Sequence, residues 1–124
     1  MRILLVEDEP EIRHVVSEYL SGSGHQVVAA ASGHEAIELI ERAELAFDAA
    51  IVDWQMTGIS GRDVLELLHE RFPHTALFLC TGLGQGQLPE RPTEAPLQGI
   101  FHKPFSMRKL NEALHRVIRP RGQG

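Results

Sequence analysis

Residues 3–10 read Ile3-Leu4-Leu5-Val6-Glu7-Asp8-Glu9-Pro10, an apolar run that ends abruptly in three acidic residues and a proline. A short run without polar alternation is typical of a strand that is buried on both faces of a parallel sheet. Pro10 suits the first turn of a helix, and acidic residues at that end interact favourably with the helix dipole. The stretch therefore predicts a buried strand followed directly by a helix, with carboxylates at the junction.

The same unit recurs along the chain. Further short apolar runs predict strands at residues 27–31, 49–52, 76–80 and 100–102. Apolar residues at helical spacing predict helices that begin at Pro10, Ser32, Ser60 and Ser106. Strands that alternate with helices form a parallel sheet with right-handed crossovers and helices on both faces. We therefore expect an α/β domain with three layers and a five-stranded parallel sheet.

One segment interrupts this alternation. A fourth helix is due between Thr81 and Ile100, but the segment holds glycines and prolines, namely Gly82, Gly84, Gly86, Pro89, Pro92 and Pro96. Both residue types disfavour a helix interior. The sequence therefore predicts a short fourth helix or a loop in its place.

Composition limits the class of protein. A length of 124 residues predicts one domain, which we place at residues 1–120 with a flexible tail at 121–124. With 12 Lys and Arg against 17 Asp and Glu, the net charge of −5 argues against nucleic acid or an anionic membrane as a partner. The single cysteine, Cys80, favours a reducing compartment, and no apolar run approaches the roughly 20 residues of a membrane span. We expect a soluble, cytoplasmic protein.

Polar side chains follow four of the predicted strands. Glu7 and Asp8 come after the first, Asp53 after the third, Thr81 after the fourth and Lys103 after the fifth. Ligands of open parallel sheets bind beyond the carboxyl ends of the strands, so these groups are expected to meet at one edge. Taken singly, each fits a simpler interpretation, the acids as helix caps or loop residues and Lys103 as surface charge. Their joint placement favours a site.

Three carboxylates at one edge require a cation or protons. Two like charges about 4 Å apart repel by roughly 4 kcal/mol at an effective dielectric constant near 20. A ligand set made only of oxygen atoms suits Mg²⁺ that also holds water and a phosphoryl oxygen. Asp53 is the central carboxylate of the three, so it is the candidate nucleophile.

The sequence resembles the receiver domain of two-component response regulators over nearly its whole length. The stretches that carry the resemblance are Leu5-Val6-Glu7-Asp8-Glu9-Pro10, Ile51-Val52-Asp53-Trp54-Gln55-Met56-Thr57-Gly58-Ile59-Ser60-Gly61, Thr81-Gly82 and Phe101-His102-Lys103-Pro104-Phe105. The resemblance implies a flavodoxin-like fold with the strand order 2-1-3-4-5. It also implies a signalling module rather than a metabolic enzyme.

The resemblance assigns roles to individual residues. Asp53 would accept a phosphoryl group from a histidine kinase or a histidine phosphotransfer protein. Asp8, Asp53 and the backbone carbonyl of Gln55 would bind Mg²⁺, with Glu7 contributing through a water molecule. Thr81 would donate its hydroxyl to a phosphoryl oxygen, and Lys103 would pair with the phosphoryl group. The bond that follows Lys103, to a proline, is often cis in this family.

Several positions depart from the family pattern. Thr57 replaces a usual proline, and Ser60 replaces an acid or asparagine. Ile100 stands where the family has a switching Tyr or Phe, while Phe101 is one position later and is expected on the other face of its strand. We therefore predict signalling through a reshaped face formed by the fourth strand, the fifth strand and the last helix.

Our interpretation is a stand-alone receiver, either a monomer or a dimer that forms on phosphorylation, with an unknown downstream protein partner. The first alternative is a pseudo-receiver that binds proteins without being phosphorylated. A second is a Mg²⁺-dependent phosphatase, which would need a general acid where this chain has Gln55.

Two further residues carry minor expectations. Cys80 is predicted to be buried and inert, and Trp54 to be exposed beside the site.

Overall fold

A computed structural model describes residues 1–56, 58–83, 87–89 and 91–117 of the chain. Five strands and four helices alternate in the order that the sequence predicts, up to the fourth strand. Their bounds are β1 (Arg2–Val6), α1 (Pro10–Gly22), β2 (Gln26–Ala30), α2 (Gly33–Arg42), β3 (Ala49–Asp53), α3 (Gly61–Arg71), β4 (Ala76–Thr81), β5 (Leu97–His102) and α4 (Met107–Val117). The predicted tail at 121–124 lies outside the described residues.

The strands form one parallel sheet in the order β2-β1-β3-β4-β5. In register, Leu5 of β1 pairs with Ile51 of β3, and Ile51 pairs with Phe78 of β4. The strand order reverses between β1 and β3, where the chain passes from one side of β1 to the other. The prediction of a flavodoxin-like sheet with three layers is confirmed, and all five carboxyl ends lie at one edge.

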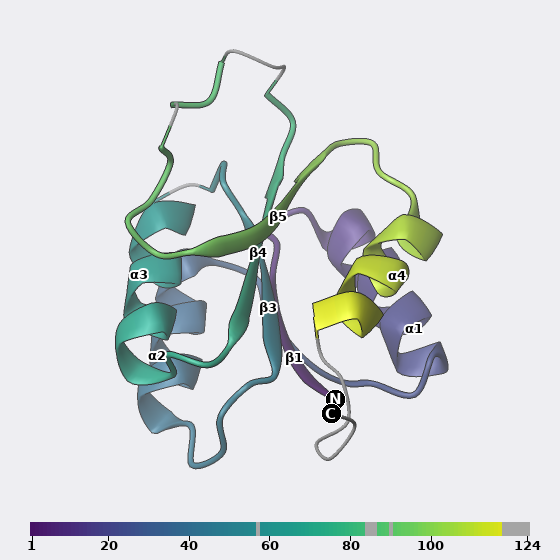
Figure 1. The fold of residues 1–124 in the computed structure, drawn as a ribbon, viewed down its shortest axis with the longest axis horizontal. Coiled ribbons are helices and arrows are strands. Elements are labelled where there is room, and N and C mark those ends of the chain that lie inside the picture. The colour runs from purple at the N-terminus through teal and green to yellow at the C-terminus, as the bar shows by residue number, and fades with distance from the viewer. Residues whose placement is uncertain (57, 84–86, 90, 118–124) are drawn as a thin grey trace.

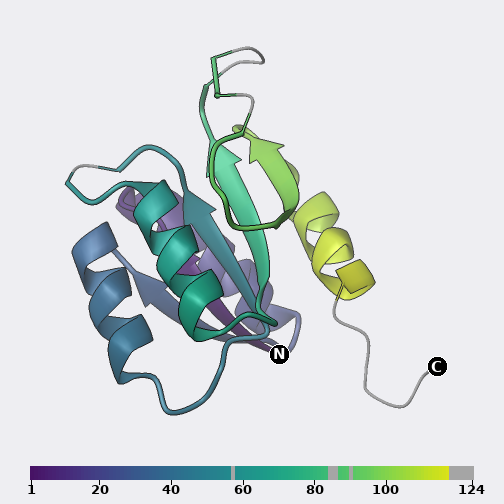
Figure 2. The same cartoon turned by 60° about the vertical axis from the view of Figure 1, so that its left-hand side comes forward.

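Two helices cover each face of the sheet. Figures 1 and 2 show α2 and α3 on one face and α1 and α4 on the other. Side chains alternate between the two faces along each strand, so Leu4 and Val6 pack toward α2 and α3 while Ile3 and Leu5 pack toward α1 and α4. The two cores explain why the central strands read as unbroken apolar runs.

Serine side chains cap three helices. The Ser32 hydroxyl accepts a hydrogen bond from the Glu35 N–H at 3.1 Å, and the Ser60 hydroxyl accepts one from the Asp63 N–H at 3.3 Å. The Ser106 hydroxyl accepts one from the Lys109 N–H, also at 3.3 Å. Each bond satisfies an N–H group that has no partner within its helix. The helix starts predicted at these serines are therefore confirmed.

The segment between β4 and β5 contains no helix among its described residues, which confirms the prediction of a loop. Its second half lies against α3. There the Arg62 guanidinium donates to the carbonyl oxygen of Pro92 at 3.0 Å, and the Thr93 hydroxyl donates to a Glu66 carboxylate oxygen at 3.1 Å. Ala95 is buried and belongs to the core on that face of the sheet.

The fifth strand begins earlier than the sequence predicts. It starts at Leu97 instead of Ile100, and the register with β4 shifts between Leu77 and Phe78. The side chain of Ile100 is 40% exposed. Phe101 packs on the opposite face against Phe78 and Phe105, with ring centroids 5.9 and 5.8 Å away. The aromatic residue is thus held in the core near α4, as the alternation of a strand requires.

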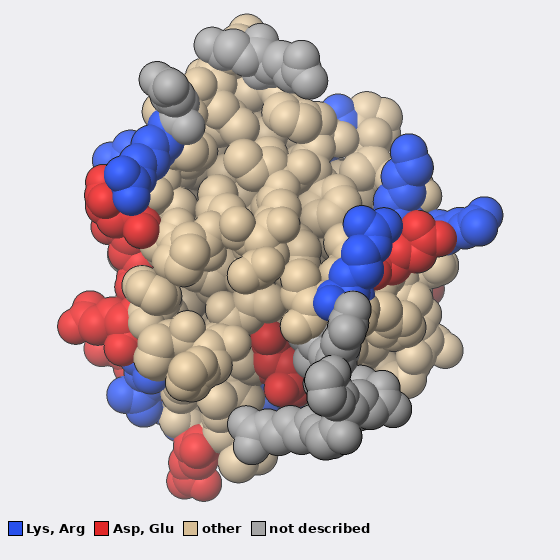
Figure 3. Space-filling view, in the orientation of Figure 1, with Lys and Arg blue, Asp and Glu red and all other residues tan. Residues whose placement is uncertain are grey.

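The surface beside β5 carries few charges. In the space-filling view of Figure 3, a broad uncharged face fills the centre, while Lys, Arg, Asp and Glu side chains gather at its left and right sides and acidic side chains also lie below it. Within the described part of the chain, no helix has the length and apolar character needed to cross a membrane.

Candidate functional site

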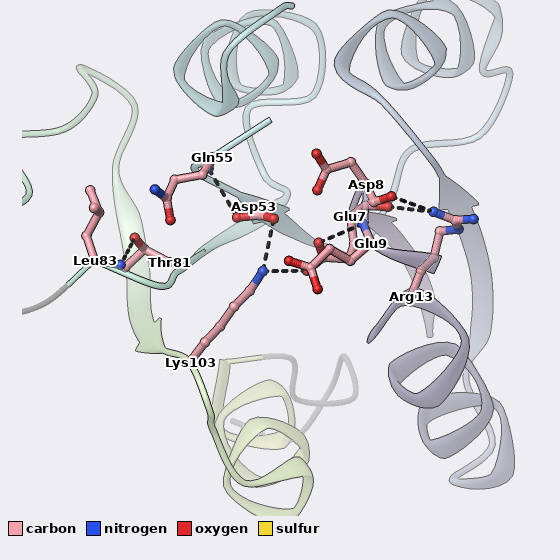
Figure 4. A network of polar contacts seen from close by, with 9 residues as sticks. All are labelled: Glu7, Asp8, Glu9, Arg13, Asp53, Gln55, Thr81, Leu83 and Lys103. Atoms are coloured by element: carbon pink, nitrogen blue, oxygen red, sulfur yellow. Dashed lines mark hydrogen bonds and ion pairs between the residues drawn. The ribbon is translucent and has the colours of Figure 1, made fainter. Parts of the chain in front are cut away.

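The site lies at the carboxyl edge of the sheet, where four strands deliver polar side chains (Figure 4). Glu7 and Asp8 follow β1 directly, Asp53 is the last residue of β3, and Thr81 is the last residue of β4. Lys103 follows β5, and its N–H donates to the carbonyl oxygen of Thr81 at 2.7 Å. Because parallel strands all end at the same edge, residues far apart in the sequence meet here.

Three carboxylates form the centre of the site. One oxygen from each of Glu7, Asp8 and Asp53 can be chosen so that all three lie within 4.8 Å of one another. Glu7 and Asp53 are only 3% and 2% exposed, whereas Asp8 is half-buried. Mutual repulsion is therefore poorly screened by water, and the cluster attracts a cation.

Lys103 supplies part of that positive charge. Its Nζ lies 2.8 Å from Oε1 of Glu7 and 3.0 Å from Oδ2 of Asp53. The Glu7 and Asp53 carboxylates therefore share one ammonium group, while Asp8 makes no ion pair within 4.0 Å among the residues described. The bond between Lys103 and Pro104 is cis, as the resemblance implies.

The pKa values of the acidic and basic groups reflect this arrangement. Burial is the main reason that the pKa of Glu7 is raised, and the neighbouring Asp53 raises it further while Lys103 lowers it. Burial alone would lower the pKa of Lys103, but its hydrogen bonds and charge interactions with Glu7 and Asp53 outweigh that effect and raise it. The site therefore holds Lys103 charged and favours the protonated form of Glu7.

Backbone contacts fix Asp53 itself. Its Oδ1 accepts a hydrogen bond from the Gln55 N–H at 3.1 Å, and the N–H of Trp54 donates to the carbonyl oxygen of Cys80 at 2.8 Å. Gly61, the first residue of α3, packs so closely that a Cβ there would lie 2.5 Å from the carbonyl oxygen of Asp53. Only glycine fits this approach, a requirement that the sequence analysis did not identify. The role of the Gln55 carbonyl as a ligand stays a prediction.

Thr81 lies in the same neighbourhood with its hydroxyl engaged elsewhere. Its Oγ1 accepts a hydrogen bond from the N–H of Leu83 at 3.0 Å, and among the described residues no hydrogen bond joins it to Asp53. The carbonyl oxygen of Leu83 in turn lies 3.0 Å from Nδ1 of His102. The first residues after β4 are thus tied to both Thr81 and the end of β5, a link that the sequence did not predict.

Of two neighbours of Asp53, Trp54 differs from the prediction and Cys80 agrees with it. Trp54 is half-buried rather than exposed, because its ring packs on the core and carries the Arg62 guanidinium 5.9 Å from its centroid. Cys80 is 3% exposed, which confirms that it is buried. Burial and the negative charge of Asp53 raise the pKa of its thiol to about 12, so it stays protonated.

The residues present suit a divalent cation. The donors are hard carboxylate oxygens, they converge from two strands, and one lysine leaves their charge incompletely balanced. Mg²⁺ prefers such oxygen ligands and retains several waters when few carboxylates are available. The predicted set of Glu7, Asp8 and Asp53 therefore fits the ion in chemistry and in mutual spacing.

Comparison with known proteins places this site in context. Residues 3–115 match the family model of the response regulator receiver domain. The response regulator protein FleR of Pseudomonas aeruginosa is 35% identical over 118 residues, which cover 93% of this chain and 24% of FleR. A cyclic di-GMP phosphodiesterase of Thermotoga maritima is 29% identical over 121 residues, which cover 98% of this chain and 32% of that protein. The chain thus spans a third or less of the length of these two relatives.

A solved structure extends the comparison to three dimensions. The response regulator protein TrrA of Thermotoga maritima, crystallised in complex with Mg²⁺ and BeF, matches with a TM-score of 0.77 and 27% sequence identity. The match covers 94% of this chain and 98% of the TrrA chain.

Proposed function

The chain belongs to the response regulator receiver domain family, and from this premise we propose that it accepts a phosphoryl group on Asp53. Receiver domains of two-component systems are signalling domains. The observation that carries the proposal is the Lys103 ammonium group held between Glu7 and Asp53, at 2.8 and 3.0 Å, beside a third carboxylate. This arrangement provides a nucleophile with a cation next to it.

In the proposed reaction an oxygen of the Asp53 carboxylate attacks phosphorus. A P–O bond forms to Asp53 as the bond from phosphorus to the donor nitrogen breaks, and the donor imidazole leaves. Asp53 needs no general base because it reacts as the carboxylate. The Gln55 N–H on Oδ1 and Lys103 on Oδ2 fix the orientation of the carboxylate before the donor arrives.

The site must also neutralise the negative charge of the phosphorylated product. Phosphorylation adds about −1.5 to −2 charge to a site that already holds three acids. Lys103 would pair with the phosphoryl oxygens, and the Thr81 hydroxyl would turn from Leu83 to donate to them. Glu7, Asp8, Asp53 and the Gln55 carbonyl would hold Mg²⁺, Glu7 through water. When bound, the ion would neutralise part of the phosphoryl charge during transfer.

The donor in this proposal is the phosphohistidine of a histidine kinase or a phosphotransfer protein in the cytoplasm. A groove of about 470 Å³ opens between α1 and the segment 103–107 that leads from β5 into α4, and Lys103 is part of its lining. Its walls include Ile12, Val15, Phe105 and Met107, so its lining is mainly apolar. A donor helix with an apolar face can rest there while its histidine reaches the carboxyl edge of the sheet.

The test is intact-protein mass spectrometry after incubation with acetyl phosphate and Mg²⁺. The wild type is expected to gain the mass of one phosphoryl group, and both the Asp53→Ala variant and wild type in EDTA are expected to gain none. Binding of beryllofluoride, followed by Trp54 fluorescence, separates slow loading from an inactive site. Absence of both a mass gain and beryllofluoride binding would favour the pseudo-receiver alternative.

A further inference from the structure

Arg13, the fourth residue of α1, reaches back to the chain that leaves β1 (Figure 4). Its Nη1 donates a hydrogen bond to the carbonyl oxygen of Glu7 at 2.9 Å and a longer one to the carbonyl oxygen of Asp8 at 3.5 Å. Its own N–H donates to the carbonyl oxygen of Glu9 at 2.9 Å. One side chain thus contacts the main chain of two of the three acidic residues that precede the helix.

In these contacts the charged guanidinium group binds neutral backbone carbonyl groups. The ion pairs found within 4.0 Å in the described part of the chain do not include one made by Arg13. The link between β1 and α1 is only three residues long, and the N–H of Glu9 also donates to Oε2 of Glu7 at 3.2 Å. Fixing the carbonyl groups in so short a link holds the Cα atoms of Glu7 and Asp8 in place and so limits where their carboxylates can lie.

The position of the Asp8 carboxylate depends most on these contacts with Arg13. The Glu7 carboxylate is held by Lys103 and by the Glu9 N–H, and the Asp53 carboxylate by Lys103 and the Gln55 N–H. Asp8 makes no ion pair with any residue that the structure describes, so its position is set by its backbone, and its carbonyl oxygen is one of the two that Arg13 contacts.

We propose that Arg13 is a positioning residue for the metal site: by holding the carbonyl oxygens of Glu7 and Asp8, it directs the Asp8 carboxylate toward Asp53. The inference rests on the proposed Mg²⁺ site and assigns to it a residue that touches neither the ion nor the phosphoryl group. The charge of Arg13 has the opposite effect, because a cation next to a metal site weakens metal binding through repulsion.

Loss of positioning weakens Mg²⁺ binding, whereas loss of charge repulsion strengthens it, so the direction of the change in affinity tests the proposal. The dissociation constant of Mg²⁺ alone is measured from the fluorescence of Trp54, the single tryptophan, for the wild type, Arg13→Lys and Arg13→Met. Arg13→Lys is expected to bind Mg²⁺ about fivefold more weakly, since it loses hydrogen bonds worth roughly 1 kcal/mol but keeps the charge. Arg13→Met is expected to bind more weakly than the wild type by a smaller factor, because it also removes a charge that repels the ion. Arg108→Lys and Arg108→Met are the matched controls, because Arg108 makes an exposed ion pair with Glu112 on α4.

Other outcomes overturn the inference. Tighter binding by Arg13→Met with unchanged binding by Arg13→Lys would mean that Arg13 acts through its charge alone. Lower stability to urea without Mg²⁺, but equal Mg²⁺ affinity in the folded variants, would mean a structural role only. If Arg13→Met does not fold, Arg13→Lys decides, because it keeps the charge and the aliphatic stem. Failure of the wild type to bind Mg²⁺ would overturn the metal site and this inference together, whereas equal binding by all three proteins would overturn this inference alone.

Discussion

The ammonium group of Lys103 lies 3.0 Å from Oδ2 of Asp53, although the two residues are 50 positions apart in the sequence. The same Nζ is 2.8 Å from Glu7, so the lysine balances part of the charge that a metal ion would also balance. Lysine and metal would therefore interact with the same carboxylates, and loss of the lysine would change the affinity of the site for the ion.

Replacement of Lys103 by Met is expected to strengthen Mg²⁺ binding and to slow phosphorylation. Loss of a neighbouring cation makes the carboxylates more attractive to the ion, by about tenfold in dissociation constant, which corresponds to roughly 1.4 kcal/mol. The reaction with acetyl phosphate loses the group that pairs with the phosphoryl oxygens. Fluorescence titration and the rate of mass gain measure the two effects. Weaker Mg²⁺ binding in Lys103→Met would contradict this account of the charge balance.

Gly61→Ala is expected to destabilise the protein by about 1–3 kcal/mol, the usual cost of overpacking. A Cβ at this position would lie 2.5 Å from the carbonyl oxygen of Asp53 and 3.0 Å from Cα of Trp54, so the end of β3 must shift. Urea unfolding measures the loss. Gly22→Ala is the matched control, because its Cβ would meet nothing within 4 Å. Equal stability of the two variants would show that α3 does not press on β3 as described.

The raised pKa of Glu7 predicts a pH dependence of stability. The folded protein holds this proton more tightly than the unfolded chain, so protonated Glu7 favours folding fully below about 4.5, the ordinary pKa of the group. That contribution is lost as the pH rises through the raised value. The free energy of unfolding of the wild type relative to Glu7→Gln is therefore expected to fall over this range in EDTA. A difference that rises with pH would mean that the ion pair with Lys103 outweighs burial.

Phosphorylation is predicted to change the β4–β5 segment rather than only the loop after Asp53. The Thr81 hydroxyl now holds the N–H of Leu83, and His102 contacts the Leu83 carbonyl oxygen. If Thr81 turns to the phosphoryl group, Leu83 loses its acceptor and the change reaches β5. Beryllofluoride is expected to shift amide resonances of residues 82–105 in NMR spectra, and less so in Thr81→Ala. Shifts confined to the loop after Asp53 would refute this route.

Much of the fold and part of the site could be predicted from the sequence. The central strands are buried on both faces, so β1, β3 and β4 appear as apolar runs that end at Glu7, Asp53 and Thr81. The sheet then brings these ends together by geometry. The edge strand β5 is exposed along one side, which weakens its apolar pattern, so the sequence predicts a start at Ile100 instead of Leu97.

The contacts that hold the site could not be predicted in the same way. Arg13 binds carbonyl oxygens, which every residue possesses, so no sequence pattern marks its partners. The need for glycine at position 61 arises from the distance between α3 and β3. The place of Trp54 directly after Asp53 predicts an exposed side chain beside the site, but Arg62 and the core cover it. These features depend on how helices pack on the sheet rather than on local composition.

The most direct measurement of the central claim is to locate the phosphoryl group. After reaction with acetyl phosphate and Mg²⁺, borohydride reduces an aspartyl phosphate to homoserine, and fragmentation of the tryptic peptide of residues 43–62 identifies the converted position. The account predicts conversion at Asp53 and none in EDTA. Conversion at Asp48, or at no aspartate while beryllofluoride also fails to bind, would contradict it.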